Sequence, residues 1–302
     1  MRHFLHLLDL SRDQLTQLIN EAIRFKAART RRALPKPLAD RVIALIFEKP
    51  SLRTRVSFES AIIQLGGASL YLAGPDVGLG WRESNADIAR TMNSFVDAVV
   101  LRVFKHETLE ELARWSSVPI INGLSDLEHP CQALADMMTV QELFGSVEGR
   151  TIAFVGDGNN VSRSLAVAAG KLGAKFILAS PPGYGFDTPF VDWFRQTIGS
   201  TLEEMTDPCK AVKNADVIYT DVWTSMGQEA EKDKRLADFV GYQVNESLMA
   251  KAPAHVRVLH CLPAHRGEEI TDGVVESDAS VVFQQAGNRM YAQMAVLAWL
   301  LG

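Results

Sequence analysis

Eight short apolar runs recur along the chain, with stretches of helical spacing between them. None of these runs alternates polar with apolar residues, which is typical of strands that are covered on both faces in a parallel sheet. The runs lie at residues 42–47, 98–104, 118–121, 152–155, 176–179, 217–219, 256–259 and 281–283. The sequence therefore predicts an α/β fold in which mostly parallel sheets are flanked by helices.

The length of the chain predicts two such domains. Its 302 residues, of which 47% are hydrophobic and 22% charged, are enough material for two cores. A polar stretch that ends just before the run at 152–155 indicates a boundary near residue 147, so we expect domains over 1–146 and 147–287. A terminal helix over 288–302 carries apolar residues at helical spacing, and we expect it to pack across the domains.

The composition argues against several partners and compartments. A formal net charge of −5 provides no global basic field for nucleic acid or for an anionic membrane. Cys131, Cys209 and Cys261 are too few and too scattered for a disulfide framework, and they fit a reducing compartment. The first ten residues have neither the charged start nor the length of a signal or spanning helix. We therefore expect a cytoplasmic protein that binds neither nucleic acid nor membrane.

The first cluster with chemical potential is the segment 47–55, where a strand ends and a helix begins. Ser51, Thr54, Arg53 and Arg55 add two hydroxyls and two guanidiniums to the free N–H groups and positive dipole of a helix start. This pattern predicts a phosphate cradle. A capped helix with surface arginines explains the same residues equally well, whereas a P-loop is excluded because its glycine-lysine motif is absent.

A second cluster follows the next strand. His129 and Gln132 are three residues apart around Pro130, which suits a first helical position, so both can point toward one ligand and bond a carbonyl oxygen. A capping histidine with a solvated glutamine is the simpler alternative. Arg102 lies in an otherwise apolar strand, where an unpaired charge is costly, and this makes it a stronger functional candidate.

The segment 156–160 argues against a nicotinamide cofactor. Its two glycines, Gly156 and Gly158, follow a strand, but Val161 stands where the dinucleotide fingerprint requires a third glycine. No acidic residue for a ribose ends the next strand. Asn160 nevertheless lies at the carboxyl end of a strand, where open α/β sheets bind ligands.

Two further segments suggest recognition of an amino acid. Asp221 can take an α-ammonium, and backbone N–H groups near Ser225 and Met226 can take a carboxylate, although a capped helix start explains them too. Cys261 has three possible roles: a structural thiol, a nucleophile, or a soft polar lining of the site. It follows His260 directly, and this spacing does not favour zinc. Arg289 is by default a solvated charge at the start of the terminal helix.

Four motifs, S-x-R-T-R, H-P-x-Q, D-x-x-x-S-M-G and H-C-L-P, stand in the chain in this order. Together they resemble the ornithine carbamoyltransferase family over almost the whole length. The resemblance implies a carbamoyl-phosphate-binding domain, an ornithine-binding domain, a terminal helix that returns to the first domain, and a trimer. It implies transfer of the carbamoyl group of carbamoyl phosphate to the δ-amine of ornithine, giving citrulline and phosphate without a metal or organic cofactor.

The resemblance also implies roles for individual residues. Phosphate would be held by Ser51, Leu52 through its backbone, Arg53 and Thr54. The carbamoyl group would be addressed by Arg102, His129 and Gln132. The α-amino and carboxylate groups of ornithine would be bound by Asn160, Asp221, Ser225 and Met226. Cys261 and Leu262 would face the δ-amine and the carbamoyl amide, and Arg289 would close over carbamoyl phosphate.

Three positions depart from the usual family pattern. Leu52 stands where one variant has threonine, and Gly287 where glutamate is usual. Gly78 stands where relatives place a side chain that reaches a neighbouring subunit's phosphate, a contact for which Trp81 and Arg82 are the nearest substitutes.

Two alternative functions follow from these patterns. The nearest is a carbamoyltransferase for putrescine, aspartate or an N-acylornithine, against which Asp221 and Ser225 argue because they match an α-ammonium and an α-carboxylate. The other is a non-catalytic amino-acid-binding protein, which Gly78 and Gly287 suggest.

Overall fold

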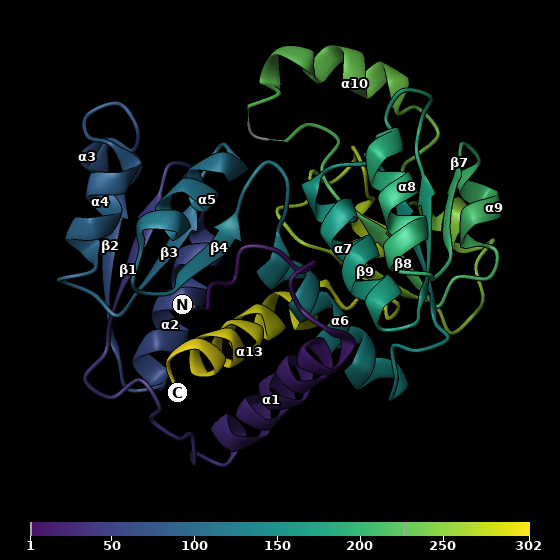
Figure 1. Ribbon diagram of the computed structural model, residues 1–302. Coiled ribbons are helices and arrows are strands. Elements are labelled where there is room, and N and C mark those ends of the chain that lie inside the picture. The colour runs from purple at the N-terminus through teal and green to yellow at the C-terminus, as the bar shows by residue number, and fades with distance from the viewer. Residues whose placement is uncertain (1, 226) are drawn as a thin grey trace. The chain divides into compact units, whose positions relative to one another are not determined.

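The computed structural model describes residues 2–225 and 227–302. The chain divides into two compact units, which we call unit 1 and unit 2. Unit 1 comprises Met1–Met138 and Gly287–Gly302, and unit 2 comprises Thr139–Ala286. Each unit contains its own parallel sheet with helices beside it (Figure 1), which confirms the predicted α/β class.

The sheet of unit 1 has four parallel strands in the order β2-β1-β3-β4. These strands are β1 (Val42–Phe47), β2 (Ala68–Ala73), β3 (Ala98–Arg102) and β4 (Ile120–Leu124). The helices that connect them are α2 (Leu52–Gln64), α3 (Gly74–Val77), α4 (Asn85–Met92) and α5 (His106–Trp115). The central strands β1 and β3 are buried along almost their whole length, as their continuous apolar sequence requires.

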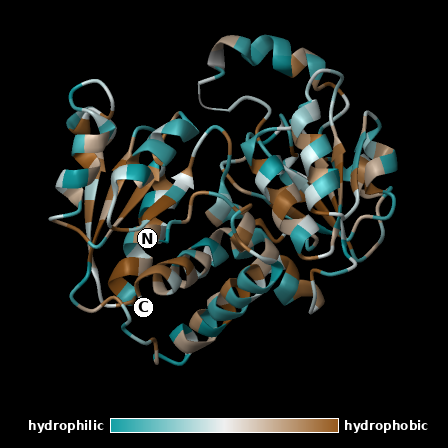
Figure 2. Ribbon diagram, viewed as in Figure 1, coloured by the Kyte–Doolittle hydropathy of each residue, from teal (hydrophilic) through white to brown (hydrophobic). Residues whose placement is uncertain are grey.

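The sheet of unit 2 has five parallel strands in the order β7-β6-β5-β8-β9. These strands are β5 (Thr151–Val155), β6 (Lys175–Ala179), β7 (Leu202–Met205), β8 (Val217–Thr220) and β9 (Arg257–His260). Its shorter helices are α7 (Asn160–Lys171), α8 (Thr188–Thr197), α9 (Pro208–Val212), the 3-10 helix η1 (Glu229–Glu231), α10 (Lys232–Asp238), α11 (Glu246–Met249) and α12 (Asp272–Val275). Hydrophobic residues concentrate in the strands of both sheets (Figure 2).

Three longer helices complete the chain: α1 (Arg12–Thr30), α6 (Pro130–Phe144) and α13 (Val282–Leu301). A capping box at Ser11 and Gln14 begins α1, because each side chain bonds the backbone N–H of the other residue. The terminal helix α13 packs on unit 1. There, Lys26 Nζ donates to Asn288 Oδ1 at 2.8 Å, and Arg29 Nη1 donates to the Tyr291 hydroxyl at 3.0 Å. The expected return of the last helix to the N-terminal part is therefore confirmed.

Two details of the predicted elements are wrong. The run at 281–283 is not a strand, because α13 already begins at Val282, and so Gly287 lies inside this helix instead of before it. Periodicity cannot separate a three-residue apolar run in a strand from one in a helix. The strands β2 and β7 were not predicted. Both are edge strands with partly exposed residues, so they lack the continuous apolar run of a central strand.

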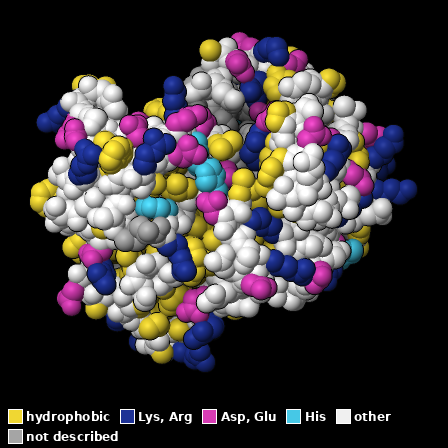
Figure 3. All heavy atoms as spheres, in the orientation of Figure 1, with side chains coloured by type: hydrophobic (Ala, Val, Ile, Leu, Met, Phe, Trp, Pro, Cys, Tyr) yellow, Lys and Arg dark blue, Asp and Glu magenta, His cyan; other side chains and the backbone are white. Residues whose placement is uncertain are grey.

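The surface agrees with the weak net charge. Lysine and arginine side chains are interspersed with aspartate and glutamate over the face shown in Figure 3. Among the described residues, no helix combines the length and the apolar character needed to cross a bilayer. An anion must therefore be held by a local arrangement of groups.

Candidate functional site

The start of α2 carries the predicted phosphate cradle. Ser51 caps this helix: its Oγ accepts a hydrogen bond from the Thr54 backbone N–H at 3.3 Å and donates to Thr54 Oγ1 at 2.9 Å. The cap satisfies one of the N–H groups that every helix start leaves without an intrahelical partner. Leu52 is exposed and Arg53 is half-buried. Because the leucine side chain is apolar, Leu52 can bond an anion only through its backbone.

Two buried guanidiniums converge on the same threonine. Arg289 Nη2 donates to Thr54 Oγ1 at 2.7 Å, and Arg102 Nη1 lies 3.5 Å from this oxygen. Thr54, Arg102 and Arg289 are 0%, 6% and 3% exposed, respectively. The interpretation of Arg289 as a solvated cap charge is therefore wrong, because it lies inside α13, on the side that packs on unit 1.

The sheet topology explains how Arg102 and Thr54 meet. In parallel β1 and β3, Phe47 is paired with Arg102, so the turn into α2 and the end of β3 share one edge of the sheet. The strand order also reverses here, because β2 lies on one side of β1 and β3 on the other. Ligands of open α/β sheets bind at the carboxyl ends of the strands at such a switch point.

His129 and Gln132 stand at the start of α6, which begins at Pro130 as predicted. Burial, together with the positive charges of Arg289 and Arg102, holds the pKa of His129 well below its usual range. The imidazole is therefore neutral at neutral pH and has one N–H to donate. The same two guanidiniums make the local field positive, which suits an anion.

The glutamine is not solvated. Gln132 is 1% exposed, and its Nε2 donates to Asp136 Oδ1 at 2.8 Å. Its Oε1 is buried and has no hydrogen-bond partner among residues 2–225 and 227–302. A buried amide oxygen of this kind requires a donor, and an amide N–H of a ligand would supply one.

Unit 2 contains a second cluster, which joins Asp221, Cys261 and Asn159. Cys261 Sγ donates to Asp221 Oδ1 at 3.0 Å, and Asn159 Nδ2 donates to Asp221 Oδ2 at 3.1 Å. Thr220 and His260 are paired across the parallel strands β8 and β9, so the residues after them, Asp221 and Cys261, emerge side by side. The order of the sheet reverses between β5 and β8, so this is again a switch point.

Asn159 was missed by the sequence analysis, which selected its neighbour Asn160. Asn159 caps α7 by accepting from the N–H groups of Val161 and Ser162, and it reaches Asp221 with its amide nitrogen. Its N-cap position is the signal that could have identified it. Asn160 is the half-buried first residue of α7.

The partner of Cys261 narrows the three roles that the sequence left open. Reactive thiolates occur beside cations, whereas this thiol donates its hydrogen to a carboxylate. A soft polar lining therefore fits better than a nucleophile. Leu262, the next residue, has a left-handed backbone (φ 58), a conformation that non-glycine residues adopt mainly at constrained positions.

Asp221, His260 and Cys261 place three possible metal ligands within 4.8 Å of one another. Both ring nitrogens of His260 are already used, because Nδ1 accepts from the Leu262 N–H at 2.9 Å and Nε2 lies 3.0 Å from Glu269 Oε1. This histidine has no lone pair left for a metal, in line with the sequence argument against zinc here.

The loop after β8 is held by a residue that the sequence analysis also missed. Arg235 of α10 is buried, and its Nη1 donates to Asp157 Oδ2 at 2.6 Å and to the Trp223 carbonyl at 3.0 Å. In the same loop, the Ser225 N–H donates to Gln228 Oε1 at 3.0 Å, which shows that it can serve an oxygen acceptor. Met226, the other predicted carboxylate ligand, lies outside the described residues.

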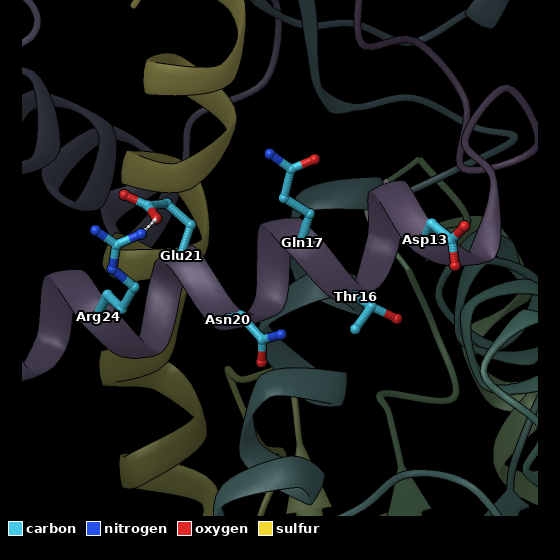
Figure 4. Close-up of a pocket in the computed structure, with 6 residues that line it drawn as sticks. All are labelled: Asp13, Thr16, Gln17, Asn20, Glu21 and Arg24. Carbon is cyan, nitrogen blue, oxygen red and sulfur yellow. Dashed lines mark hydrogen bonds and ion pairs between the residues drawn. The ribbon is translucent and has the colours of Figure 1, made fainter.

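A hollow on the outer face of α1 does not coincide with either cluster. It is lined by Asp13, Thr16, Gln17, Asn20, Glu21 and Arg24 (Figure 4). All six side chains come from one helix, and Glu21 and Arg24 form an ordinary ion pair three residues apart. Such a row of polar residues is typical of the solvent side of an amphipathic helix.

Comparison with known proteins gives a consistent result over the whole chain. Residues 2–142 match the carbamoyl-P binding domain of aspartate/ornithine carbamoyltransferases, and residues 148–300 match the Asp/Orn binding domain. Ornithine carbamoyltransferase from Archaeoglobus fulgidus is 49% identical over 302 residues, covering 100% of this chain and 98% of the relative. The enzyme of the same name from Anoxybacillus flavithermus is 46% identical over 303 residues, covering 99% and 96%.

The solved structures agree. Ornithine carbamoyltransferase from Pyrococcus furiosus superposes with a TM-score of 0.96 at 48% identity, covering 100% of this chain and 97% of that one. The enzyme from Thermus thermophilus gives a TM-score of 0.89 at 42% identity, covering 99% and 98%. On the strength of both domain matches and of these full-length similarities, the chain belongs to the aspartate/ornithine carbamoyltransferase family.

Proposed function

We propose that the chain transfers the carbamoyl group of carbamoyl phosphate to the δ-amine of L-ornithine, giving L-citrulline and phosphate. The observation that carries this proposal is the convergence of Arg102 and Arg289 on Thr54 beside a neutral His129. Buried cations at a hydroxyl and a helix start suit a dianionic phosphate. The names of the matched domains and of the full-length relatives support the two substrates.

The donor substrate belongs to unit 1 in this proposal. Its phosphate is held by Ser51, the Leu52 backbone, Arg53 and Thr54, and Arg289 closes over it. The carbonyl oxygen accepts from Arg102 and from the one N–H of neutral His129. The carbamoyl amide donates to the buried Gln132 Oε1. We assign this function to residues 1–146 together with 288–302.

The acceptor substrate belongs to residues 147–287. Asp221 binds the α-ammonium of ornithine with Asn160, and the backbone at Ser225 and Met226 binds the carboxylate. Cys261 and Leu262 line the path of the δ-amine and the carbamoyl amide. Ornithine is mostly a dication at neutral pH, so desolvation beside Cys261 favours the uncharged amine that can attack.

The reaction follows from these contacts. The lone pair of the δ-amine forms a C–N bond with the carbonyl carbon, negative charge grows on the carbonyl oxygen, and the C–O bond to phosphate breaks. The nitrogen then loses its extra proton to the departing phosphate, which leaves neutral citrulline and hydrogen phosphate. Arg102 and His129 stabilise the growing charge, and Arg53 and Arg289 stabilise the leaving phosphate. Loss of one such donor typically costs about 3 kcal/mol of transition-state stabilisation.

We further propose a cytoplasmic homotrimer. The family resemblance supports the trimer, and the three scattered cysteines, Cys131, Cys209 and Cys261, support a reducing compartment. Analytical ultracentrifugation should give three times the chain mass of 33.3 kDa, or a multiple of that value. A monomer at micromolar concentration would contradict the trimer.

An amine panel tests the proposed function. Purified protein is given carbamoyl phosphate with ornithine, putrescine, aspartate or N-acetylornithine, and both the carbamoylated product and phosphate are measured. We expect ornithine to have by far the highest kcat/KM. Faster turnover of any other amine would reassign the acceptor, and ligand binding without phosphate release would indicate a non-catalytic protein.

A further inference from the structure

A compact set of metal-ligand atoms lies in unit 1, apart from the residues assigned above. His6 precedes α1, while His106 and Glu110 are four residues apart on α5 and so share a face of that helix. The Nε2 atoms of the two histidines are 3.0 Å apart, and His6 Nε2 is 3.6 Å from Glu110 Oε1. All three ligand atoms lie within 4.8 Å of one another.

We propose that His6, His106 and Glu110 bind a transition-metal dication such as Zn²⁺, with water as the fourth ligand. Ligands about 2.0–2.1 Å from a tetrahedral zinc are roughly 3.3 Å from each other. The separations of 3.0 and 3.6 Å lie on either side of this value. Two imidazoles and one carboxylate are a ligand set that zinc uses when a fourth position stays open.

The other ring nitrogens of both histidines are held by a second layer of contacts. His6 Nδ1 lies 3.0 Å from Glu128 Oε1, and His106 Nδ1 lies 2.7 Å from Ser125 Oγ. The carboxylate of Glu128 is buried and is fixed in turn by the Leu7 N–H at 3.1 Å. Histidines that bind a metal through Nε2 are oriented in this way through Nδ1, and these contacts direct both Nε2 atoms to one point.

The surrounding charge favours a cation. Two carboxylates lie beside His6: Glu128 Oε1 is 3.0 Å from its Nδ1, and Glu110 Oε1 is 3.6 Å from its Nε2. Asp126, whose Oδ1 accepts from the backbone N–H of His106 at 2.8 Å, adds a further carboxylate. The nearest positive side chain in the sequence is Lys105, the N-cap of α5, and it is exposed.

Solvent can reach this cluster. The His106 side chain is buried, whereas the side chains of His6 and Glu110 are 18% and 51% exposed. An ion can therefore enter without unfolding unit 1. Without a metal, the same 3.0 Å contact would be an N–H···N hydrogen bond between the two imidazoles. The experiment separates these two cases.

The test is a titration of tag-free, chelator-treated, full-length protein with Zn²⁺ alone, measured by calorimetry, in the wild type and in His6→Ala and Glu110→Gln. Glu107→Gln removes an equal charge from an exposed position on the same helix and is the matched control. We expect one Zn²⁺ per chain in the wild type and in Glu107→Gln. We expect loss of binding in His6→Ala and at least about tenfold weaker binding in Glu110→Gln, the usual minimum even for loss of an outer partner.

A parallel titration with Co²⁺ identifies the ligands. Histidine and carboxylate ligands give no thiolate-to-metal charge-transfer absorption, whereas binding at Cys261 would produce it. That absorption, the absence of wild-type binding, or equal affinity in Glu110→Gln and the wild type would each overturn the proposal. The readout is binding, so its outcome is independent of carbamoyl transfer.

Discussion

The clusters of unit 1 and unit 2 are built with opposite charge. In unit 1, Arg102 and Arg289 converge on a neutral hydroxyl, and their field helps to keep His129 uncharged. In unit 2, a carboxylate at Asp221 accepts from a thiol and an amide. In the function proposed above, the positive cluster suits the dianionic donor, and the carboxylate suits the α-ammonium of the acceptor.

The clusters also differ in how they are assembled. The unit 2 cluster comes from strand ends and a helix start that neighbour each other at one switch point, β5 to β8. The unit 1 cluster needs the equivalent switch point, β1 to β3, and in addition Arg289 from α13, some 235 residues away from Thr54 along the chain. The unit 1 cluster therefore takes one of its members, Arg289, from the last helix, whereas Asp221, Cys261 and Asn159 of the unit 2 cluster all lie outside that helix.

The largest effect should come from breaking the scaffold of unit 2. Arg235→Ala removes the cation from Asp157, whose side chain is only 14% exposed, and the loss of one partner from such a pair typically costs about 3–5 kcal/mol of stability. Burial already raises the pKa of Asp157 above its usual value despite Arg235. The pair Arg235→Met with Asp157→Leu should therefore lose much less stability than the single variant. Denaturant unfolding measures both, and equal losses would contradict this account of the pair.

Removing one cation from unit 1 should have an effect of similar free energy, but on activity instead of stability. Arg289→Ala should lower kcat/KM by roughly a hundredfold to a thousandfold, because one donor to the transition state is lost. Arg24→Ala, an exposed arginine of α1 in unit 1, is the control and should retain wild-type turnover. Steady-state kinetics measures turnover, and circular dichroism checks that both variants are folded. Turnover of Arg289→Ala near the wild-type value would refute the phosphate site.

Removing the carboxylate of Asp221 in unit 2 should chiefly weaken the binding of the acceptor, ornithine. Asp221→Ala should raise KM for ornithine by about tenfold to a hundredfold, the usual weight of a hydrogen bond to a charged group. KM for carbamoyl phosphate should change much less, since all the proposed ligands of its phosphate are in unit 1. Asp192→Ala removes an exposed carboxylate of the same unit as a control. A rise in both KM values would show that the two substrates are not bound by separate units.

The smallest effect is on the pH dependence of stability. The pKa of His129 is lowered in the folded protein, so below pH of about 6.5 the unfolded chain takes up a proton that the folded chain does not. Stability therefore falls as pH falls, with up to about 1.4 kcal/mol per pH unit from this group. His129→Asn should flatten the slope between about pH 6.5 and 5, as measured by denaturant unfolding. An unchanged slope, judged against exposed His255→Asn, would contradict a buried neutral imidazole.

Prediction from the sequence succeeded where one local signal was sufficient. Seven of the eight apolar runs coincide with strands, Ser51 is a helix cap, and Pro130 begins α6. It failed for the edge strands β2 and β7, and for the start of α13, where Gly287 was taken as a boundary. An exposed edge and a glycine tolerated inside a helix leave no distinct pattern along the chain.

The sequence by itself determined the α/β class, the segments that carry the site residues and the family, because strand burial, helix caps and motifs are all written in neighbouring residues. Only the tertiary structure decided that Arg289 is buried against Thr54, that Asn159 bonds Asp221, and that Arg235 holds the loop after β8. The physical reason is that the burial and partner of a charge depend on residues distant in the chain. A guanidinium on a helix has the same sequence context whether it faces water or another helix.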